Sequence, residues 1–86
     1  MYAIATKPNI DKIFLKLKNK DPEQLKIVYR KIEQIIMNPY HFKPLRGDMH
    51  GSRRVHIGKS FVLVYEIYEK EKVVTLLDYD HHDKIY

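Results

Sequence analysis

The spacing of hydrophobic positions changes about halfway along this chain, which predicts helices in the first half and strands in the second. After the short apolar start "MYAIAT", the segment "PNIDKIFLKLKNK" has apolar residues at helical spacing. The next segment begins "DPEQ", where Asp21 suits a helix cap, Pro22 the first helical position and Gln24 the third position after the cap. Its apolar stripe consists of Leu25, Val28, Ile32, Ile35 and Ile36. Asn38-Pro39 ends it, so the pattern predicts a strand followed by two helices joined by a tight turn.

The second half alternates with the period of a β-strand. "RRVHI" is followed by Gly58-Lys59, a pair typical of a two-residue hairpin turn, and then by the β-rich runs "SFVLVYEIY" and "VVTLLDYD". This turn sets three cross-strand pairs: Ile57 with Ser60, His56 with Phe61, and Arg54 with Leu63. The predicted order is β-α-α-β-β-β, a two-layer α+β fold whose last three strands form an antiparallel meander, in a single domain over residues 1–86.

Alternation along the first strand of the meander places Arg54 and His56 on one face of the sheet and Val55 and Ile57 on the other. A two-layer domain has one sheet face under helices and one face open. Arg54 and His56 side by side on the open face would suit a phosphate group.

Composition limits the possible partners. The 86 residues include sixteen Lys and Arg against eleven Asp and Glu, a formal net charge of +5 that suits nucleic acid or an acidic protein. Cysteine is absent from the sequence, which excludes disulfides and thiolate zinc sites. We expect a cytoplasmic protein without a membrane segment, because no apolar run is long enough for a signal peptide or a span.

The segment "HFKPLRGDMHGSRRVHIGK" combines glycines with many cations and predicts a surface that contacts phosphates. Its basic residues are Lys43, Arg46, Arg53, Arg54 and Lys59. Histidine can give or take a proton near neutral pH. RNA cleavage through the 2′-hydroxyl needs a base, an acid and cations that stabilise the phosphorane, so a histidine pair among arginines and lysines suits that reaction without a metal.

The tail "DYDHHDKIY" raises metal binding as a rival hypothesis. On a regular strand, one face would carry Val74, Leu76, Asp78, Asp80 and His82, and the other Thr75, Leu77, Tyr79 and His81. His81 and His82 would then point apart and could not both bind one ion. The pattern therefore favours a site without metal or cofactor, in which Asp80 is a candidate to orient His82.

The chain resembles the RelE/ParE superfamily of toxins from type II toxin–antitoxin modules. "PLRGDMHGSRRVHIGKSFVLVYEI" and the terminal "DHHDKIY" look most like the RelE and YafQ branch of ribosome-associated mRNA interferases. The resemblance implies that two helices cover one side of the sheet while the other side receives mRNA on the ribosome. It also implies an antitoxin partner, in a complex that can bind operator DNA.

Several site residues follow from the resemblance. His56 and His82 match the catalytic histidines of YafQ-like members, Tyr86 matches their terminal aromatic residue, and Arg54 falls on the active-site strand. Lys43, Arg46, Arg53 and Lys59 are then expected to bind RNA, while His41, His50 and His81 are expected at the surface. The chain departs from related toxins at Lys43, Ser60 and Val62, where those proteins carry a glutamate or histidine, an acidic residue and an arginine.

Two other functions remain open at this point. A ParE-like inhibitor of DNA gyrase shares the fold and needs no catalytic histidines. An inactive homologue that only binds antitoxin or operator DNA is suggested by Lys43 and Ser60, which stand where charged catalytic groups are expected.

Overall fold

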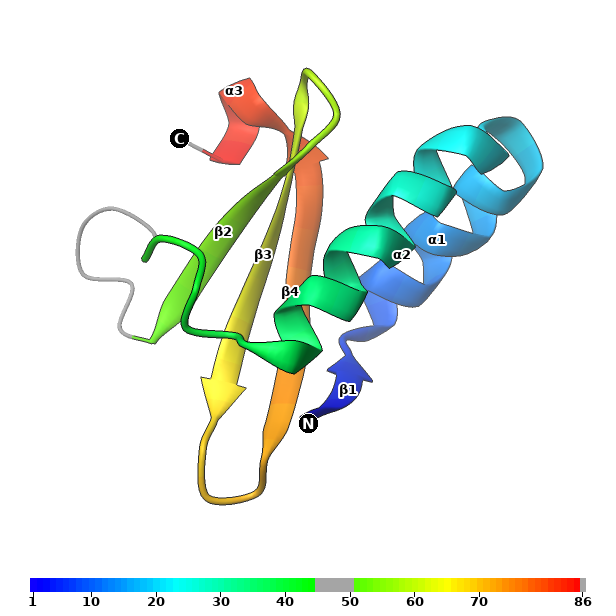
Figure 1. Cartoon of the computed structure of the whole chain (residues 1–86). Coiled ribbons are helices and arrows are strands. Elements are labelled where there is room, and N and C mark those ends of the chain that lie inside the picture. The colour runs from blue at the N-terminus through cyan, green and yellow to red at the C-terminus, as the bar shows by residue number, and fades with distance from the viewer. Residues whose placement is uncertain (45–50, 86) are drawn as a thin grey trace.

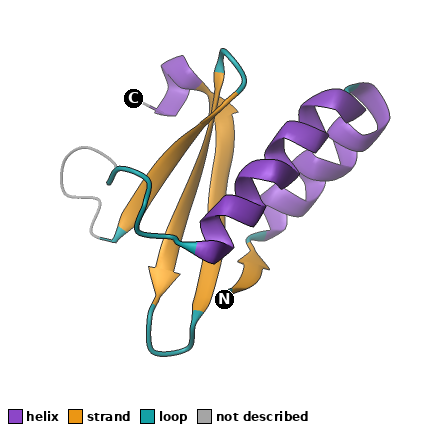
Figure 2. Ribbon diagram, viewed as in Figure 1, coloured by secondary structure: helices purple, strands orange, loops and turns teal. Residues whose placement is uncertain are grey.

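The computed structural model describes residues 1–44 and 51–85, and its elements follow the predicted order (Figures 1 and 2). Strand β1 (Ala3–Thr6) leads into α1 (Pro8–Lys20) and α2 (Pro22–Met37). Strands β2 (Ser52–Ile57), β3 (Phe61–Tyr68) and β4 (Val73–His81) follow, and a one-turn helix, α3 (His82–Ile85), ends the described chain. The α+β prediction is confirmed, whereas the terminal helix was not predicted.

The strands form one sheet in the order β1-β4-β3-β2. Strands β2, β3 and β4 are antiparallel neighbours, as predicted for the meander, and β1 pairs in parallel with β4 at the opposite edge from β2. Helices α1 and α2 lie together on one side of this sheet, and α3 lies on the other side, near the β2–β3 turn (Figure 1).

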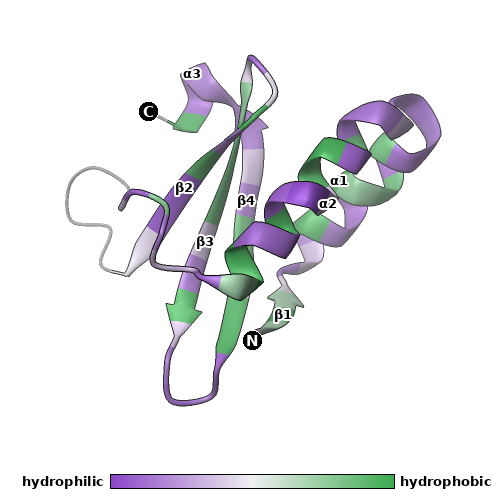
Figure 3. Cartoon of the chain, viewed as in Figure 1, coloured by the Kyte–Doolittle hydropathy of each residue, from purple (hydrophilic) through white to green (hydrophobic). Residues whose placement is uncertain are grey.

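The predicted start of α2 is observed in detail. The side chain of Asp21 accepts a hydrogen bond from the main-chain N–H of Gln24 at 3.2 Å, and Pro22 occupies the first turn. An N-cap of this kind satisfies one of the N–H groups that a helix start leaves without an intrahelical partner. The turn between α1 and α2 is hydrophilic (Figure 3), while Ile10 of α1 and Leu25 of α2 are buried in the core.

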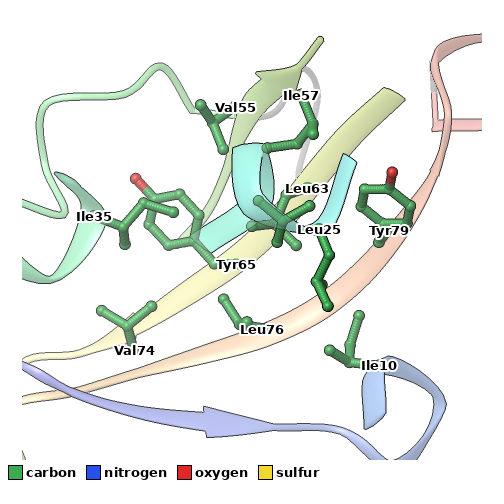
Figure 4. Close-up of a cluster of buried hydrophobic side chains, with 11 residues drawn as sticks. Ile10, Leu25, Ile35, Val55, Ile57, Leu63, Tyr65, Val74, Leu76 and Tyr79 are labelled. Atoms are coloured by element: carbon green, nitrogen blue, oxygen red, sulfur yellow. The ribbon is translucent and has the colours of Figure 1, made fainter. Parts of the chain in front are cut away.

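The hydrophobic core fills the space between the helices and one sheet face (Figure 4). Its buried members are Ile10, Leu25, Val28, Ile35, Val55, Ile57, Leu63, Tyr65, Val74, Leu76 and Tyr79. Tyr65 is fully buried, and its hydroxyl donates to the main-chain carbonyl of Pro39 at 2.6 Å. Burial raises the pKa of Tyr65 to about 12, so the phenol stays protonated and keeps this bond to the loop after α2.

The β3–β4 turn is tied to distant parts of the chain through Glu69. One of its carboxylate oxygens accepts hydrogen bonds from the hydroxyls of Tyr2 at 2.6 Å and Tyr40 at 2.7 Å, and the other pairs with Lys72. The hydrogen bond from Lys72 comes first among the causes that lower the pKa of Glu69 to about 2, followed by those from the two tyrosines. This carboxylate therefore joins the N-terminal segment, the loop after α2 and the hairpin.

Replacing Glu69 with glutamine is expected to lower thermal stability at neutral pH. Because the folded protein lowers the pKa of Glu69 from 4.5 to about 2, its stabilisation is complete above pH 4.5 and is lost as the pH falls towards 2. Melting temperatures of wild type and E69Q, followed by circular dichroism, should thus differ at pH 7 and converge near pH 2. E33Q, at an exposed glutamate of α2, is the matched control. An equal gap at both pH values would contradict this prediction.

None of the helices within residues 1–44 and 51–85 is long and apolar enough to cross a membrane.

Candidate active site

Strand β2 presents two different faces, as its alternation predicts. Val55 and Ile57 are buried in the core against the helices, and Arg54 and His56, which alternate with them, point to the opposite, open face. Arg54 is partly exposed and His56 is exposed. The strand therefore holds one guanidinium and one imidazole on the side of the sheet that α1 and α2 leave uncovered.

The predicted register of the β2–β3 hairpin is wrong by one residue. Gly58, Lys59 and Ser60 all lie in the turn, and Ile57 pairs with Phe61, His56 with Val62, and Arg54 with Val64. A slip of one residue moves every side chain of a strand to the other face. The predicted pairs would have turned Leu63 away from the helices, so burial of Leu63 and Tyr65 in the core favours the observed register.

The predicted alternation along β4 is also wrong, because the strand contains a bulge. Tyr65 pairs with Leu76 and Val64 with Asp78, which leaves Leu77 as the extra residue. Before the bulge, Val74 and Leu76 face the core; after it, Tyr79 does. Asp78 and Asp80 consequently lie on the open face instead of sharing the face of Val74 and Leu76.

The end of β4 brings the two candidate catalytic histidines together. The main-chain N–H of His82 donates to the carbonyl of Ser60 at 2.7 Å, and His82 begins α3 rather than extending the strand. Its ring stacks on that of His56, with centroids 5.6 Å apart and an angle of 22° between the planes. Asp83 Oδ1 lies 3.7 Å from Nδ1 of His82, a pairing that the sequence did not predict.

His81 is separated from this pair. His81 pairs with Phe61 across the sheet, and its imidazole ring meets the Phe61 ring edge to face at a centroid distance of 5.2 Å. Phe61 in turn stacks on Tyr79, which belongs to the core. Asp80 accepts a hydrogen bond from the main-chain N–H of His81 at 2.7 Å, and its orienting role towards His82 stays a prediction.

Two rows of residues cross the open face through valines of β3. Val62 pairs with His56 on one side and Asp80 on the other, and Val64 lies in the same way between Arg54 and Asp78. Both valines are buried, with exposed fractions of 0% and 4%, although they face away from the main core. The polar groups therefore stand over an apolar floor, where electrostatic interactions are stronger than in open water.

The predicted RNA-binding residues that the structure describes do not all lie together. Arg53 turns to the other side of β2, where its guanidinium donates to the carbonyl of Phe42 at 2.6 Å and lies over the ring of Tyr40. Lys59 lies exposed in the β2–β3 turn. Arg46, His50 and Tyr86 lie outside the described residues.

Lys43 is held close to β2. Its main-chain carbonyl accepts a hydrogen bond from the N–H of Arg54 at 3.1 Å. Along this edge there is an open pocket of about 500 Å³, lined among others by Lys31, His41, Phe42, Lys43, Arg54 and His56. Sequence reasoning missed Lys31 and Phe42, and assigned His41 only to the surface; the one signal for Phe42 was its place beside the basic loop residues.

The described residues do not provide a set of ligands for a metal centre. Within residues 1–44 and 51–85, no group of three or more His, Asp, Glu or Cys side chains could hold an ion. The arrangement offers instead two imidazoles in contact, a nearby guanidinium and an apolar floor. Such a set can move protons and bind an anion.

Comparison with known proteins identifies the class to which this chain belongs. The family model described as "ParE toxin of type II toxin-antitoxin system, parDE" matches residues 5–86. A relative from Methanocaldococcus jannaschii, named "Putative toxin RelE4", is 48% identical over 86 residues, covering 100% of this chain and 92% of the relative. The molecule is thus a toxin of the RelE/ParE superfamily of type II toxin–antitoxin systems.

Within that class, the chain belongs to the ParE toxin family. Two solved structures show the same fold. The YoeB/ParE toxin from Agrobacterium tumefaciens has a TM-score of 0.84 at 15% identity, covering 93% of this chain and 98% of that one. The toxin–antitoxin complex RelBE of E. coli has a TM-score of 0.74 at 25% identity, covering 94% and 96%.

Proposed function

We propose that this toxin is a ribosome-dependent endoribonuclease that cuts mRNA by acid–base catalysis without a metal, and so inhibits translation. The observation that carries this proposal is the contact between His56 and His82 on the open face, next to Arg54. A toxin that acts only by binding its target needs no such pair.

The proposed reaction divides the work between these side chains. One histidine takes the proton from the 2′-hydroxyl, whose oxygen attacks the adjacent phosphorus. The bond from phosphorus to the 5′ oxygen breaks, and the other histidine gives that oxygen its proton. Arg54 stabilises the negative charge on the phosphorane, and the products are a 2′,3′-cyclic phosphate and a 5′-hydroxyl end. Tyr86 would stack beside the nucleotide at the cut.

The proposed partners follow from charge and from the family. The similar E. coli RelBE structure is a toxin–antitoxin complex, and the net charge of +5 suits an acidic antitoxin. We therefore propose a cognate antitoxin that covers the open face, in a complex able to bind operator DNA. The toxin would act in the cytoplasm, where ribosomes translate.

The direct test combines purified toxin, ribosomes and a defined mRNA. Mapping the cuts relative to the reading frame should give fragments only when ribosomes are present, with cyclic phosphate at the 3′ ends. A nuclease that activates water with a metal would leave other ends. Intact mRNA in this assay, with growth arrest that H82A does not relieve, would rule the proposal out.

Inhibition of DNA gyrase is the second candidate, favoured by the match to the ParE toxin family model. A supercoiling assay with purified toxin separates the two functions. Inhibition that persists in the H56A and H82A variants would support this candidate over the nuclease.

A further inference from the structure

The pocket at the edge of β2 is built from parts of the chain that are distant in sequence. Lys31 comes from α2, and His41, Phe42 and Lys43 come from the loop that follows it. The remaining wall belongs to β2, including Arg54 and the candidate catalytic His56. Its volume of about 500 Å³ is within the range of small-ligand sites.

The lining of the pocket is cationic and aromatic. Lys31, Lys43 and Arg54 carry positive charge, and none of the described residues that line the pocket is acidic. The Phe42 ring packs against the core, lies 5.9 Å from the Lys31 ammonium and meets the His41 ring edge to face at 5.0 Å. Cations around an aromatic surface are the combination by which proteins bind single-stranded nucleic acid.

We propose that this pocket binds one nucleotide of the RNA strand next to the cleaved phosphate. The base of this nucleotide would lie against Phe42, and its own phosphate would lie between Lys31, Lys43 and Arg54. The inference rests on the proposed nuclease function, because His56 forms part of the wall. A nucleotide held here would fix the position of the strand relative to the two histidines, so the pocket would set affinity and base preference near the cut.

Two variants test the pocket without removing a proposed catalytic group. K31Q removes one cation, and F42L removes the aromatic face but keeps apolar volume against the core. K12Q is the matched control, at an exposed lysine of α1 outside the pocket. The first readout is the fluorescence anisotropy of a labelled single-stranded RNA whose 2′-O-methyl groups prevent cleavage. The second is kcat and KM for mRNA cleavage on ribosomes.

We expect F42L to weaken RNA binding roughly fivefold or more, because stacking on an aromatic ring is lost. K31Q should weaken it severalfold and reduce the slope of log K against log salt concentration by about 0.7, the value for one phosphate contact on a single strand. Both variants should raise KM with kcat largely retained, and K12Q should match wild type.

Three results would overturn the pocket proposal, and only the third would also overturn the proposed nuclease function. If wild type cleaves mRNA but K31Q and F42L bind RNA as K12Q does, the pocket proposal is wrong and the nuclease stands. If both variants lose affinity for the antitoxin and keep it for RNA, the occupant is an acidic protein segment. If wild type neither cleaves nor binds RNA, both proposals fail together.

Discussion

Replacing His82 with alanine is expected to slow mRNA cleavage by at least about 100-fold, because a positioned acid or base contributes typically 10²–10⁴-fold. His82 stacks on His56 and lies in α3, with its side chain 48% exposed and outside the core. The substitution should therefore remove a proton-transfer group and leave the fold intact. Single-turnover cleavage on stalled ribosomes measures the rate, and the melting temperature checks the fold.

His81 supplies the matched control, since it is the neighbouring histidine but contacts Phe61 instead. H81A should cleave at close to the wild-type rate. The double variant H56A/H82A should lose little more than H82A alone, because groups that act as a unit in one reaction are not additive. Equal losses of cleavage rate in H81A and H82A would show that cleavage depends on the shape of the tail rather than on the His82 imidazole.

The sequence predicted those features of the fold that depend on local patterns of residues. Asp21 and Pro22 set the start of α2, and the helical spacing of Leu25, Val28 and Ile35 identified side chains that the structure buries. Alternation in β2 likewise put Arg54 and His56 on one face. Each of these features depends on residues only a few positions apart, so one segment contains the whole signal.

The strand registers could not be predicted, because they depend on which side chains the helices cover. The run from Val62 to Tyr65 is apolar at every position and buried on both faces, so its pattern does not say which face meets the helices. Leu76 and Leu77 are adjacent and equally apolar, and only pairing with β3 shows that Leu77 is the bulge. Both errors concern strands whose hydrophobicity does not alternate.

The geometry of the candidate site was predicted only in part, for the same reason. His56 and His82 were singled out from the chemistry and the resemblance, and the structure brings their rings into contact. The turn of α3 was missed because four residues are too few to show helical spacing. The pocket was missed because Lys31 looks like an ordinary polar residue of α2 until the fold places it near β2.

Leu63 is the position where we expect the largest loss of stability. Its side chain is fully buried in the core, on the face of β3 opposite the histidines. L63A should lower the free energy of unfolding by about 2–5 kcal/mol, since it removes buried methyl groups and leaves a cavity. L15A makes the same chemical change at a residue of α1 that is 62% exposed. It should change the free energy of unfolding by less than about 0.5 kcal/mol. Urea denaturation measures both.

The same two variants test whether packing and chemistry are separate in this small protein. Val62, next to Leu63, belongs to the open face of the sheet, where it lies between His56 and Asp80. If β3 divides the molecule into a packed side and a reactive side, L63A kept well below its melting temperature should cleave mRNA at nearly the wild-type rate per folded molecule. H82A should show the reverse, with normal stability and little cleavage. A large loss of rate in folded L63A would mean instead that the position of the histidines depends on the exact packing beneath them.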